Sequence, residues 1–546
     1  MEKISFRQVS SLDKIFLDQP DNIEELEKIS ALKNERVSYQ IAYRGNEIYF
    51  NDNVTIQVCS PLKKQIAIYE VGNVPVEFPF RGGHDAHFER TTPGLYPDVL
   101  YPIEGDCITI TWRNWHSLWI KVALDGSIGA GVYPIDIHFN CGDFSTTKHM
   151  ELEVIGADLP EQTLQFTQWL HADCIADYYK IPVFSERHWQ LIDEYIKTAT
   201  ENGINMLLTP IITPPLDTAW GGERTTIQLV DIVKEGSAYR FNFDKLERWI
   251  NIGKKHGIAY FEMAHLFTQW GAWATPKIIA TVDGVEKQIF GWDVASASPE
   301  YKEFLTVFLP SLYQFLKDQG ITDRTFFHIS DEPQSEHLEH YLALKKMVQD
   351  ILPEAKLMEA CSSYDLFKTC EMSFAIPAVD HIRPFIENGV DNLWTYYCCD
   401  QEIVVPNRFI AMPSYRNRVI ATQLYKYDIK GFLHWGFNFY NSALSRRKIN
   451  PFVNTDADNT FPSGDAFSVY PGENGCLMSI RLLVFYEALQ DLRAFQLLEG
   501  FVGKEAVVRL MEDTAGMEIH FDQYPHNKQF LLNLREKVNM EIKKHL

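Results

Sequence analysis

Two adjacent acids, Asp331 and Glu332, follow a short, largely apolar segment (residues 325–330) and precede Pro333. Proline has no N–H to donate to a sheet, so the chain is expected to turn there and to present both carboxyl groups at the end of a strand. Neighbours in a regular strand point to opposite faces, so both acids reach one ligand only if the strand becomes irregular. The alternative is structural: Asp331 caps the next helix and Glu332 lies in its first turn.

Paired carboxyl groups at a barrel mouth are typical of glycoside hydrolysis, where one is the general acid and the other a nucleophile or charge stabiliser. The seventh predicted strand (392–397) is followed by no acid until Asp400 and Glu402. This absence favours substrate-assisted cleavage, in which the 2-acetamido oxygen of the sugar attacks. Such a mechanism needs an acid/base and a carboxylate that orients the amide N–H, and Glu332 and Asp331 would fill these roles.

Two other interpretations stay open. In one, Glu332 is the acid of a glycosidase of other specificity, and Asp400 or Glu402 is its nucleophile. In the other, the chain is a non-catalytic carbohydrate-binding protein on a degenerate barrel, although the intact acid pair argues against degeneration.

Aromatic and polar residues near predicted strand ends are candidates for a sugar pocket, because aromatic rings cover the apolar faces of sugars. Trp435 ends the eighth predicted strand, and Asn438 just beyond it could bind a hydroxyl. His171 and His265 follow the first and third predicted strands and could do the same. The other candidates are Trp169, Trp394, Tyr396 and Tyr397. Each of these side chains could equally be part of the packing.

The elements that position these residues fall into three parts. Residues 1–158 alternate apolar and polar side chains in several short runs, such as 37–43 and 132–139, which predicts an antiparallel β-sandwich. Residues 159–500 alternate short apolar strands with helical segments, which predicts a (β/α)8 TIM-like barrel. Residues 501–546 are expected to be a helical appendix. The fold class is therefore multidomain, β plus α/β.

The eight predicted barrel strands cover 165–171, 205–210, 259–264, 325–330, 356–360, 373–377, 392–397 and 431–436. One intervening helix begins at Asp244, with Glu247 in the position of a capping box, and is expected to end at Gly257. A final amphipathic helix covers 479–500.

Composition narrows the function. The net charge of -22 argues against nucleic acid and anionic membranes as partners. No run of about 20 apolar residues predicts membrane insertion, and no apolar signal core is found near the start. The 9 cysteines form no regular framework. Together these features predict a cytoplasmic protein with reduced thiols, the alternative being a secreted protein whose leader has been removed.

No metal or other cofactor is expected. The sequence has no HExxH motif, and His84 and His87 lie in a predicted loop without a clear third ligand. There is no glycine-rich phosphate loop. The expected partner is a carbohydrate, and the sequence carries no sign of an oligomeric state.

Four segments give a resemblance that spans nearly the whole chain. They are residues 34–40 (NERVSYQ), 330–333 (SDEP), 431–438 (GFLHWGFN) and 464–482 (GDAFSVYPGENGCLMSIRL). Together they resemble glycoside hydrolase family 123 and the related proteins labelled domain of unknown function 4091. The resemblance implies a retaining, exo-acting β-N-acetylgalactosaminidase with substrate assistance, acting on oligosaccharide or glycolipid glycan ends. It also implies that Asp331 stabilises the amide and that Glu332 is the acid/base.

Overall fold

The N-terminal part consists of two packed five-stranded sheets in the computed structural model, which describes residues 3–19 and 24–546. The first sheet has the order β1 (Ile4–Ser10), β3 (Arg36–Gly45), β8 (His116–Ala123), β5 (Ile66–Val76) and β6 (Gly94–Pro102). The second has the order β2 (Lys28–Leu32), β10 (Phe144–Ile155), β9 (Gly131–Cys141), β4 (Asn51–Cys59) and β7 (Cys107–Thr111). All neighbouring strands are antiparallel except β2 and β10.

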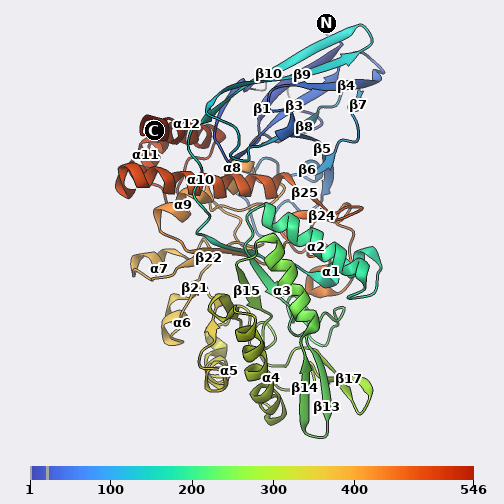
Figure 1. Cartoon of the computed structure of the whole chain (residues 1–546), viewed down its shortest axis with the longest axis vertical. Helices are drawn as coiled ribbons and strands as arrows, with labels where there is room; N and C mark the ends of the chain where they lie inside the picture. The colour runs from blue at the N-terminus through green and yellow to red at the C-terminus, as the bar shows by residue number, and fades with distance from the viewer. Residues whose placement is uncertain (1–2, 20–23) are drawn as a thin grey trace.

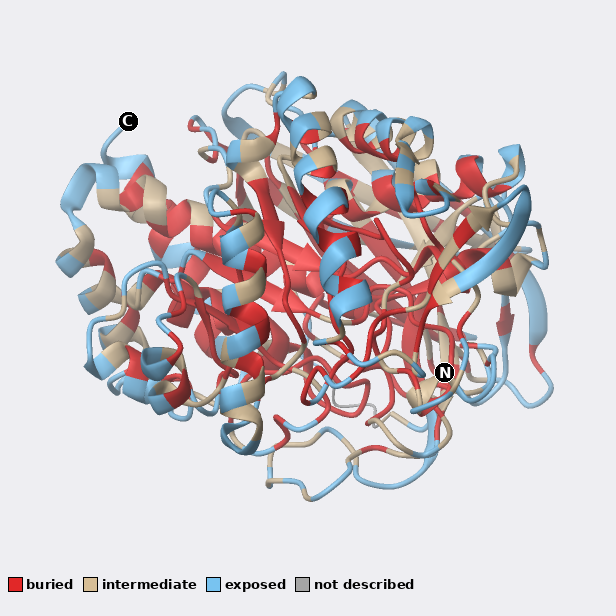
Figure 2. Cartoon of the chain, turned by 90° about the horizontal axis from the view of Figure 1, so that it is seen from below, coloured by how far each residue is buried: buried red, intermediate tan, exposed pale blue. Residues whose placement is uncertain are grey.

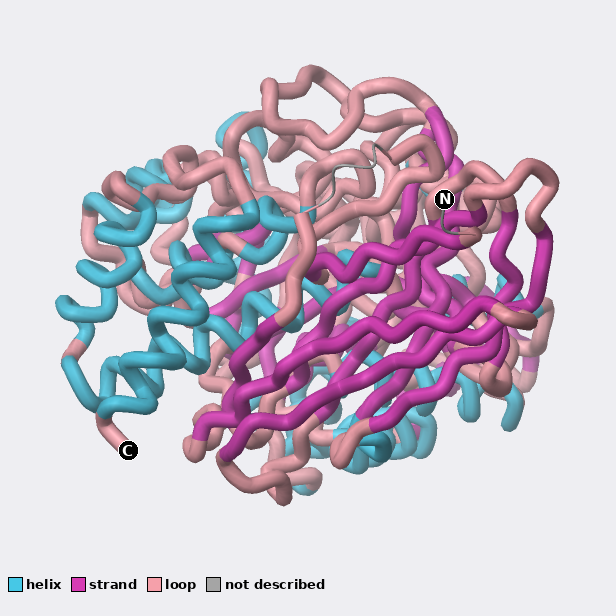
Figure 3. The backbone as a smooth tube through the Cα atoms, turned by 90° about the horizontal axis from the view of Figure 1, so that it is seen from above, coloured by secondary structure: helices cyan, strands magenta, loops and turns pink. Residues whose placement is uncertain are grey.

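Alternating apolar side chains hold the two sheets together. In β4, Val54 and Ile56 are buried while their neighbours are exposed, as expected for a strand with one face on a core. Phe6 of the first sheet stacks on Phe139 of the second, with ring centroids 4.3 Å apart. The predicted sandwich is confirmed, and Figure 3 shows its strands beside the C-terminal helices.

A curled parallel sheet forms the centre of the remaining chain. Its order is β19 (Lys356–Leu357), β18 (Thr325–Phe327), β15 (Tyr260–Met263), β12 (Met206–Thr209), β11 (Gln165–Gln168), β23 (Gly431–His434) and β22 (Trp394–Tyr396). β20 (Glu359–Ala360) and β21 (Ala375–Ile376) form a separate parallel pair. Most of these strand residues are buried, because helices cover the outer face. Figure 2 shows the buried strands surrounded by helices with exposed outer faces.

Helices follow the strands, as the alternating pattern predicts. They are α1 (Ala172–Tyr179), α2 (Glu186–Glu201), α3 (Asp244–His256), α4 (Pro299–Asp318), α5 (Leu338–Ile351), α6 (Tyr364–Thr369), α7 (Arg383–Glu387), α8 (Ser414–Arg418), α9 (Ile420–Lys426) and α10 (Ile480–Val502). The C-terminal α11 (Lys504–Ala515) and α12 (Lys528–Lys544) come last, so the predicted helical end of the chain is present. No helix among the described residues is both long enough and apolar enough to cross a membrane.

Two small sheets interrupt this alternation. β14 (Ala238–Asn242), β13 (Asp231–Glu235), β16 (Ile278–Val282) and β17 (Val285–Phe290) form a four-stranded sheet that projects from one end of the molecule (Figure 1). β24 (Val469–Pro471) and β25 (Cys476–Met478) form a hairpin before α10. In the described part of the chain, short 3₁₀ turns cover 63–65, 322–324, 335–337 and 443–445.

Two local predictions were wrong. The capping box at Asp244 is absent, because Phe243 occupies the cap position and makes no side-chain cap bond, while Asp244 lies in the first turn. The predicted end of that helix at Gly257 is correct, with φ +92°. α10 is not simply amphipathic, since it is buried around most of its circumference. It runs between the sandwich and the parallel sheet and is covered from both sides (Figure 1).

Candidate active site

Asp331 and Glu332 lie where the chain leaves β18. The regular strand ends at Phe327, the chain bends at both acids, and Glu332 has φ +45°, in the left-handed region that non-glycine residues seldom occupy. The predicted irregularity is therefore present. The capping alternative is wrong, because α5 begins only at Leu338 and no side chain caps it.

Hydrogen bonds hold this strand end from both sides. The buried carboxylate of Glu359 accepts the backbone N–H of Ile329 at 2.5 Å and that of Ser330 at 3.3 Å. On the other side, the hydroxyl of Ser330 donates to the carbonyl of Thr268 at 2.9 Å, and the N–H of Trp270 donates to the carbonyl of Asp331 at 3.3 Å. Backbone strain persists where the surroundings fix it, and such places are often functional sites.

Both acids line a cavity of about 410 Å³, a size suited to one sugar unit. Three of the predicted sugar-binding aromatics, Trp169, Tyr396 and Trp435, line it too. The remaining lining residues are Arg81, Leu216, Asp217, Gln269, Trp270, Ala360, Cys398, Cys399, Asp400, Leu433, Ala443, Leu444, Thr460 and Phe461.

Burial and mutual repulsion determine the charge state of the pair. Burial, then the charges of Glu332 and Asp217, raise the pKa of Asp331 well above its usual range. Burial also raises the pKa of Glu332, against a hydrogen bond of 2.6 Å from the Tyr396 hydroxyl that favours the carboxylate. The two acids therefore titrate as one unit that keeps a proton to higher pH than free carboxyl groups do.

A third carboxyl group, Asp217, was not predicted. Burial raises its pKa to about 6, and its Oδ2 accepts the N–H of Leu444 at 2.9 Å. Its own N–H donates to Oε1 of Gln269 at 2.5 Å, which ties its loop to the segment after β15.

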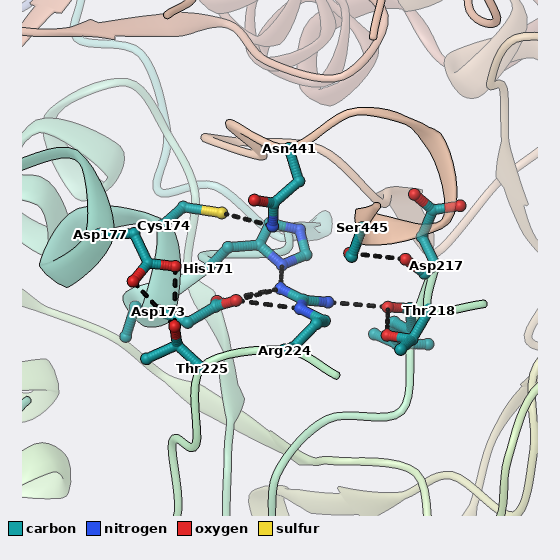
Figure 4. A network of polar contacts seen from close by, with 12 residues as sticks. His171, Asp173, Cys174, Asp177, Asp217, Thr218, Arg224, Thr225, Asn441 and Ser445 are labelled. Atoms are coloured by element: carbon teal, nitrogen blue, oxygen red, sulfur yellow. Dashed lines mark hydrogen bonds and ion pairs between the residues drawn. The ribbon is translucent and has the colours of Figure 1, made fainter. Parts of the chain in front are cut away.

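A buried arginine positions this loop (Figure 4). Arg224 donates two hydrogen bonds of 2.9 Å to Asp173 and one of 2.8 Å to the carbonyl of Leu216, the residue before Asp217. It also approaches Nδ1 of His171 at 3.2 Å. Burial and the guanidinium charge lower the pKa of His171 to about 4, so the ring is neutral. His171 therefore belongs to this network and lies behind the residues that line the cavity.

The cavity aromatics are fixed by their polar atoms. The indole N–H of Trp169 donates to Glu262 at 3.2 Å, and that of Trp435 donates to Asp465 at 3.0 Å. The rings are thereby oriented before any ligand binds.

The other four predicted sugar-binding residues do not line the cavity. Trp394 is buried against Gly431 in the sheet interior. The hydroxyl of Tyr397 donates to Asn417 at 3.1 Å, and His265 stacks on His328 with ring centroids 4.2 Å apart. Asn438 exchanges two hydrogen bonds, of 2.8 and 3.0 Å, with the backbone of His171. These contacts give all four side chains structural partners.

The two candidate alternative nucleophiles are also engaged. Glu402 accepts the successive backbone N–H groups of Arg81, Gly82 and Gly83, the last two at 2.7 and 2.9 Å. Asp400 forms an ion pair with the guanidinium of Arg81 at 2.5 Å. A loop from the N-terminal part therefore reaches the cavity wall.

One group in the described part of the chain has metal-ligand spacing: the thiols of Cys398 and Cys399 and the carboxylate of Asp400, whose ligand atoms lie within 4.8 Å of one another. The Arg81 guanidinium contacts the sulfur of Cys399 at 3.6 Å as well as Asp400. A fixed positive charge against two of the three ligands disfavours a cation there.

Arg81, Asp217, Gln269 and Trp270 were missed because they lie on loops without periodic pattern. For Gln269 and Trp270 a signal was present, since they lie on the loop that follows the third parallel strand, β15. Active sites lie at the carboxyl ends of such strands, so polar and aromatic residues on the loop that follows are candidates for the site. Arg81 had no such signal, because it belongs to the N-terminal part.

Comparisons with known proteins agree with this architecture. A family model described as "Glycoside hydrolase 123, catalytic domain" matches residues 169–498. The structure of a family 123 glycoside hydrolase from Clostridium perfringens, described in terms of glycolipid glycan hydrolysis, has a TM-score of 0.74 at 17% identity, covering 99% of this chain and 98% of that chain.

Two other solved structures are much less similar. A β-glucuronidase from Parabacteroides merdae has a TM-score of 0.30 at 10% identity, covering 89% of this chain and 52% of that chain. An endo-β-1,4-mannanase from Thermotoga petrophila has a TM-score of 0.35 at 12% identity, covering 62% and 78%. No curated protein sequence matches the chain.

Proposed function

Because the chain belongs to glycoside hydrolase family 123, we propose that it releases terminal β-linked N-acetylgalactosamine from oligosaccharides or glycolipid glycans, with retention of configuration. That it is a glycoside hydrolase follows from the family; the sugar and the mechanism are the proposal. The observation that carries the mechanism is the adjacent, proton-retaining pair Asp331 and Glu332 on one cavity.

In the first step, Glu332 gives its proton to the glycosidic oxygen while the 2-acetamido carbonyl oxygen attacks C1. The bond to the leaving group breaks, and an oxazolinium ion forms within the sugar. Asp331 accepts a hydrogen bond from the amide N–H and offsets the positive charge that develops there. In the second step, Glu332 takes a proton from water as the water oxygen attacks C1. The bond between C1 and the acetamido oxygen breaks, which opens the oxazolinium ring and restores the 2-acetamido group.

This sequence needs one proton and one negative charge on the pair. In the ligand-free site, the hydrogen bond from Tyr396 favours charge on Glu332, while burial and the neighbouring charges favour the protonated form of Asp331. A bound amide N–H would reverse this preference by stabilising the charged form of Asp331. Substrate binding would therefore place the proton where the first step requires it.

The neighbouring acids support a nucleophile supplied by the substrate. Glu402 is held by three backbone N–H groups and Asp400 by Arg81, so neither is poised for attack. Asp217 also lines the cavity, but its carboxylate is held by the backbone N–H of Leu444 instead of by an ion pair, and its charge acts on Asp331. A second candidate function is therefore a glycosidase in which Asp217 forms the covalent intermediate.

A series of para-nitrophenyl glycosides separates the two. Substrate assistance predicts turnover of the N-acetylgalactosaminide and almost none of the galactoside, which has no acetamido group. It also predicts protection by a thiazoline analogue of the oxazolinium ion. Equal turnover of both glycosides, together with loss of activity in Asp217→Asn, would establish the second candidate instead. The N-acetylglucosaminide tests the configuration at C4.

The parallel sheet is also proposed to close into a complete (β/α)8 barrel. β18 pairs with β19, β20 pairs with β21, and Ala378 forms a bridge with Tyr396 of β22. Closure would protect the amides of Cys361 and Val379, whose N–H groups donate to Ile376 and Tyr396 at 3.0 and 2.9 Å. Hydrogen exchange as fast as in exposed loops at these two amides would contradict closure.

A further inference from the structure

Exposed tryptophans are concentrated beside the acid pair. Of the 12 tryptophans, the four that are exposed are Trp112, Trp220, Trp270 and Trp273. Trp112 belongs to the N-terminal part. The other three lie on two loops that follow β12 and β15, at the end of the parallel sheet that carries Asp331. Exposed apolar surface that gathers on neighbouring loops is typical of interaction sites, so the position of these three tryptophans indicates a ligand.

The loop that follows β15 is held in an unusual conformation. Trp270, Gly271 and Ala272 all have positive φ, at +54°, +108° and +55°. On one side, Trp270 donates to the carbonyl of Asp331. On the other, Nε2 of His340 lies 3.1 Å from the carbonyl of Ala272. The loop is therefore fixed directly to the residue that carries the chemistry.

Gly271 makes room for the second tryptophan. A β-carbon at Gly271 would lie 2.6 Å from Nε1 of Trp273, so only glycine permits this approach. One face of the Trp273 ring stacks on His340, with centroids 4.4 Å apart and planes 15° from parallel. The side chain still remains 48% exposed, which leaves ring surface for a ligand.

The loop that follows β12 is joined to the loop after β15 by the hydrogen bond from the backbone N–H of Asp217 to Oε1 of Gln269. It carries Trp220, which is 67% exposed and lies 5.0 Å from the ring of Trp292. The indole of Trp292 is in turn fixed by a 2.8 Å hydrogen bond to the carbonyl of Gly222. Trp220 thus rests on a supported ring.

We propose that Trp220, Trp270 and Trp273 form an aglycone-binding surface, on which the sugars preceding the cleaved terminal residue stack. The inference rests on the proposed function, since the terminal sugar would occupy the cavity and the leaving chain would extend from its mouth. Trp270 lines the cavity and would meet the first leaving sugar, while Trp220 and Trp273 lie outside the lining and would meet more distant sugars. A neutral glycan suits this surface, because the protein carries a net charge of -22.

The surface is tested by comparing two substrates. One is a neutral tetrasaccharide that ends in N-acetylgalactosamine, and the other is the fluoride of N-acetylgalactosamine alone. Fluoride is too small to reach the loops. For Trp270→Ala and Trp273→Ala, we expect kcat/KM on the tetrasaccharide to fall about tenfold more than on the fluoride, mainly through KM. Trp220→Ala should show the effect on the tetrasaccharide but not on a disaccharide. Trp270→Phe should restore most of the loss, and Trp112→Ala is the unchanged control.

Binding to the Glu332→Gln protein separates this proposal from the proposed function. If calorimetry shows that the tetrasaccharide binds the Glu332→Gln protein and that each tryptophan substitution weakens binding, the surface is supported even where turnover fails. Equal losses on tetrasaccharide and fluoride, or binding that the substitutions leave unchanged, would overturn it. Absence of hydrolysis of every N-acetylgalactosaminide by the unsubstituted protein would overturn the proposed function alone.

Discussion

The hydroxyl of Tyr396 opposes the effect that burial has on Glu332. Burial disfavours the charged carboxylate, while the hydrogen bond of 2.6 Å from Tyr396 stabilises it. The phenol itself is held by a second contact of 3.3 Å to the hydroxyl of Ser362. The acid strength of Glu332 therefore depends on one neighbouring hydroxyl group.

Removal of that hydroxyl should move the pH profile. In Tyr396→Phe, the charged form of Glu332 loses a hydrogen-bond donor, so the pKa of Glu332 rises further. The general acid works in its protonated form, so the alkaline limb of kcat/KM shifts to higher pH. The pH dependence of aryl glycoside hydrolysis measures this shift. Tyr397→Phe is the matched control, because Tyr397 bonds to Asn417 outside the cavity; an equal shift in both variants would contradict the role of Tyr396.

Substitution of the two acids should have different consequences. Glu332→Gln removes the proton donor, so hydrolysis of substrates with poor leaving groups should fall by about 10²–10⁴, while activated aryl glycosides are spared more. Asp331→Asn removes the charge that offsets the oxazolinium ion and should damage both substrate types. Comparison of a disaccharide with a dinitrophenyl glycoside measures the difference. Mild and equal effects at both positions would remove the acids from the mechanism.

The position of the pair was predictable because it needs only local information. An apolar strand followed by two acids and Pro333 predicts a strand end, and the left-handed Glu332 lies there. Only some of the predicted sugar-binding residues line the cavity, because a residue at a strand end can point into the cavity or into the packed interior. Trp435 does the first and Trp394 the second, and their neighbours in sequence do not distinguish them.

At the scale of elements, two glycines show how strongly packing constrains the sheet. A β-carbon at Gly431 of β23 would lie 2.0 Å from the indole of Trp394 on the neighbouring strand β22, whereas one at Gly500 of α10 would meet nothing within 4 Å. Trp394 can therefore fill the sheet interior only because residue 431 has no side chain.

Alanine at these two positions should change stability in opposite directions. Gly431→Ala should destabilise the protein by about 1–3 kcal/mol or more through overpacking. Gly500→Ala should stabilise it by about 0.5–1 kcal/mol, because alanine loses less backbone entropy in a helix. Urea denaturation followed by fluorescence gives both values. A neutral Gly431→Ala would show that Trp394 has room to move.

The sequence predicted the elements whose patterns are regular and missed those at edges. β6 contains Pro97 and Pro102, which obscure the alternating pattern of a strand. Its place at the edge of its sheet explains why prolines are tolerated there. The β13–β17 insertion was missed because each of its four strands has only five or six residues. The parallel strands were recovered because burial on both faces makes them continuously apolar.

At the scale of the whole molecule, buried charges join the parts of the chain. Arg535 of α12 donates to Glu35, just before β3, at 2.7 Å and to Asp491 of α10 at 3.1 Å. Asp491 also pairs with Arg418 of α8 at 2.7 Å. These side chains are buried, so each charge depends on its partners. The cytoplasmic location and the boundaries of the three predicted parts stay predictions. Because the network joins residues of all three parts, we expect them to unfold together.

Loss of Arg535 should therefore weaken the whole protein. Arg535→Met leaves Glu35 buried without its cation and should cost about 3–5 kcal/mol, in a single unfolding transition seen by calorimetry. The exposed ion pair of Arg240 with Glu235 provides the control, since Arg240→Met should cost under about 1 kcal/mol. Equal costs, or separate transitions for the sandwich and the parallel sheet, would contradict this view.

The pH dependence of the same variant tests the cause. Burial raises the pKa of Glu35 and the charge of Arg535 opposes that rise, so Arg535→Met raises the pKa of Glu35 further. A carboxyl group whose pKa is raised in the folded protein does not reduce the free energy of unfolding below its unfolded pKa of about 4.5, because it is protonated in both states. As the pH rises from there through the folded pKa, the free energy of unfolding falls. The deficit of Arg535→Met should therefore shrink at acidic pH, and Glu35→Gln in the same chain should recover part of it at neutral pH. A deficit that stays constant with pH and is unaffected by Glu35→Gln would assign the loss to side-chain packing instead of charge.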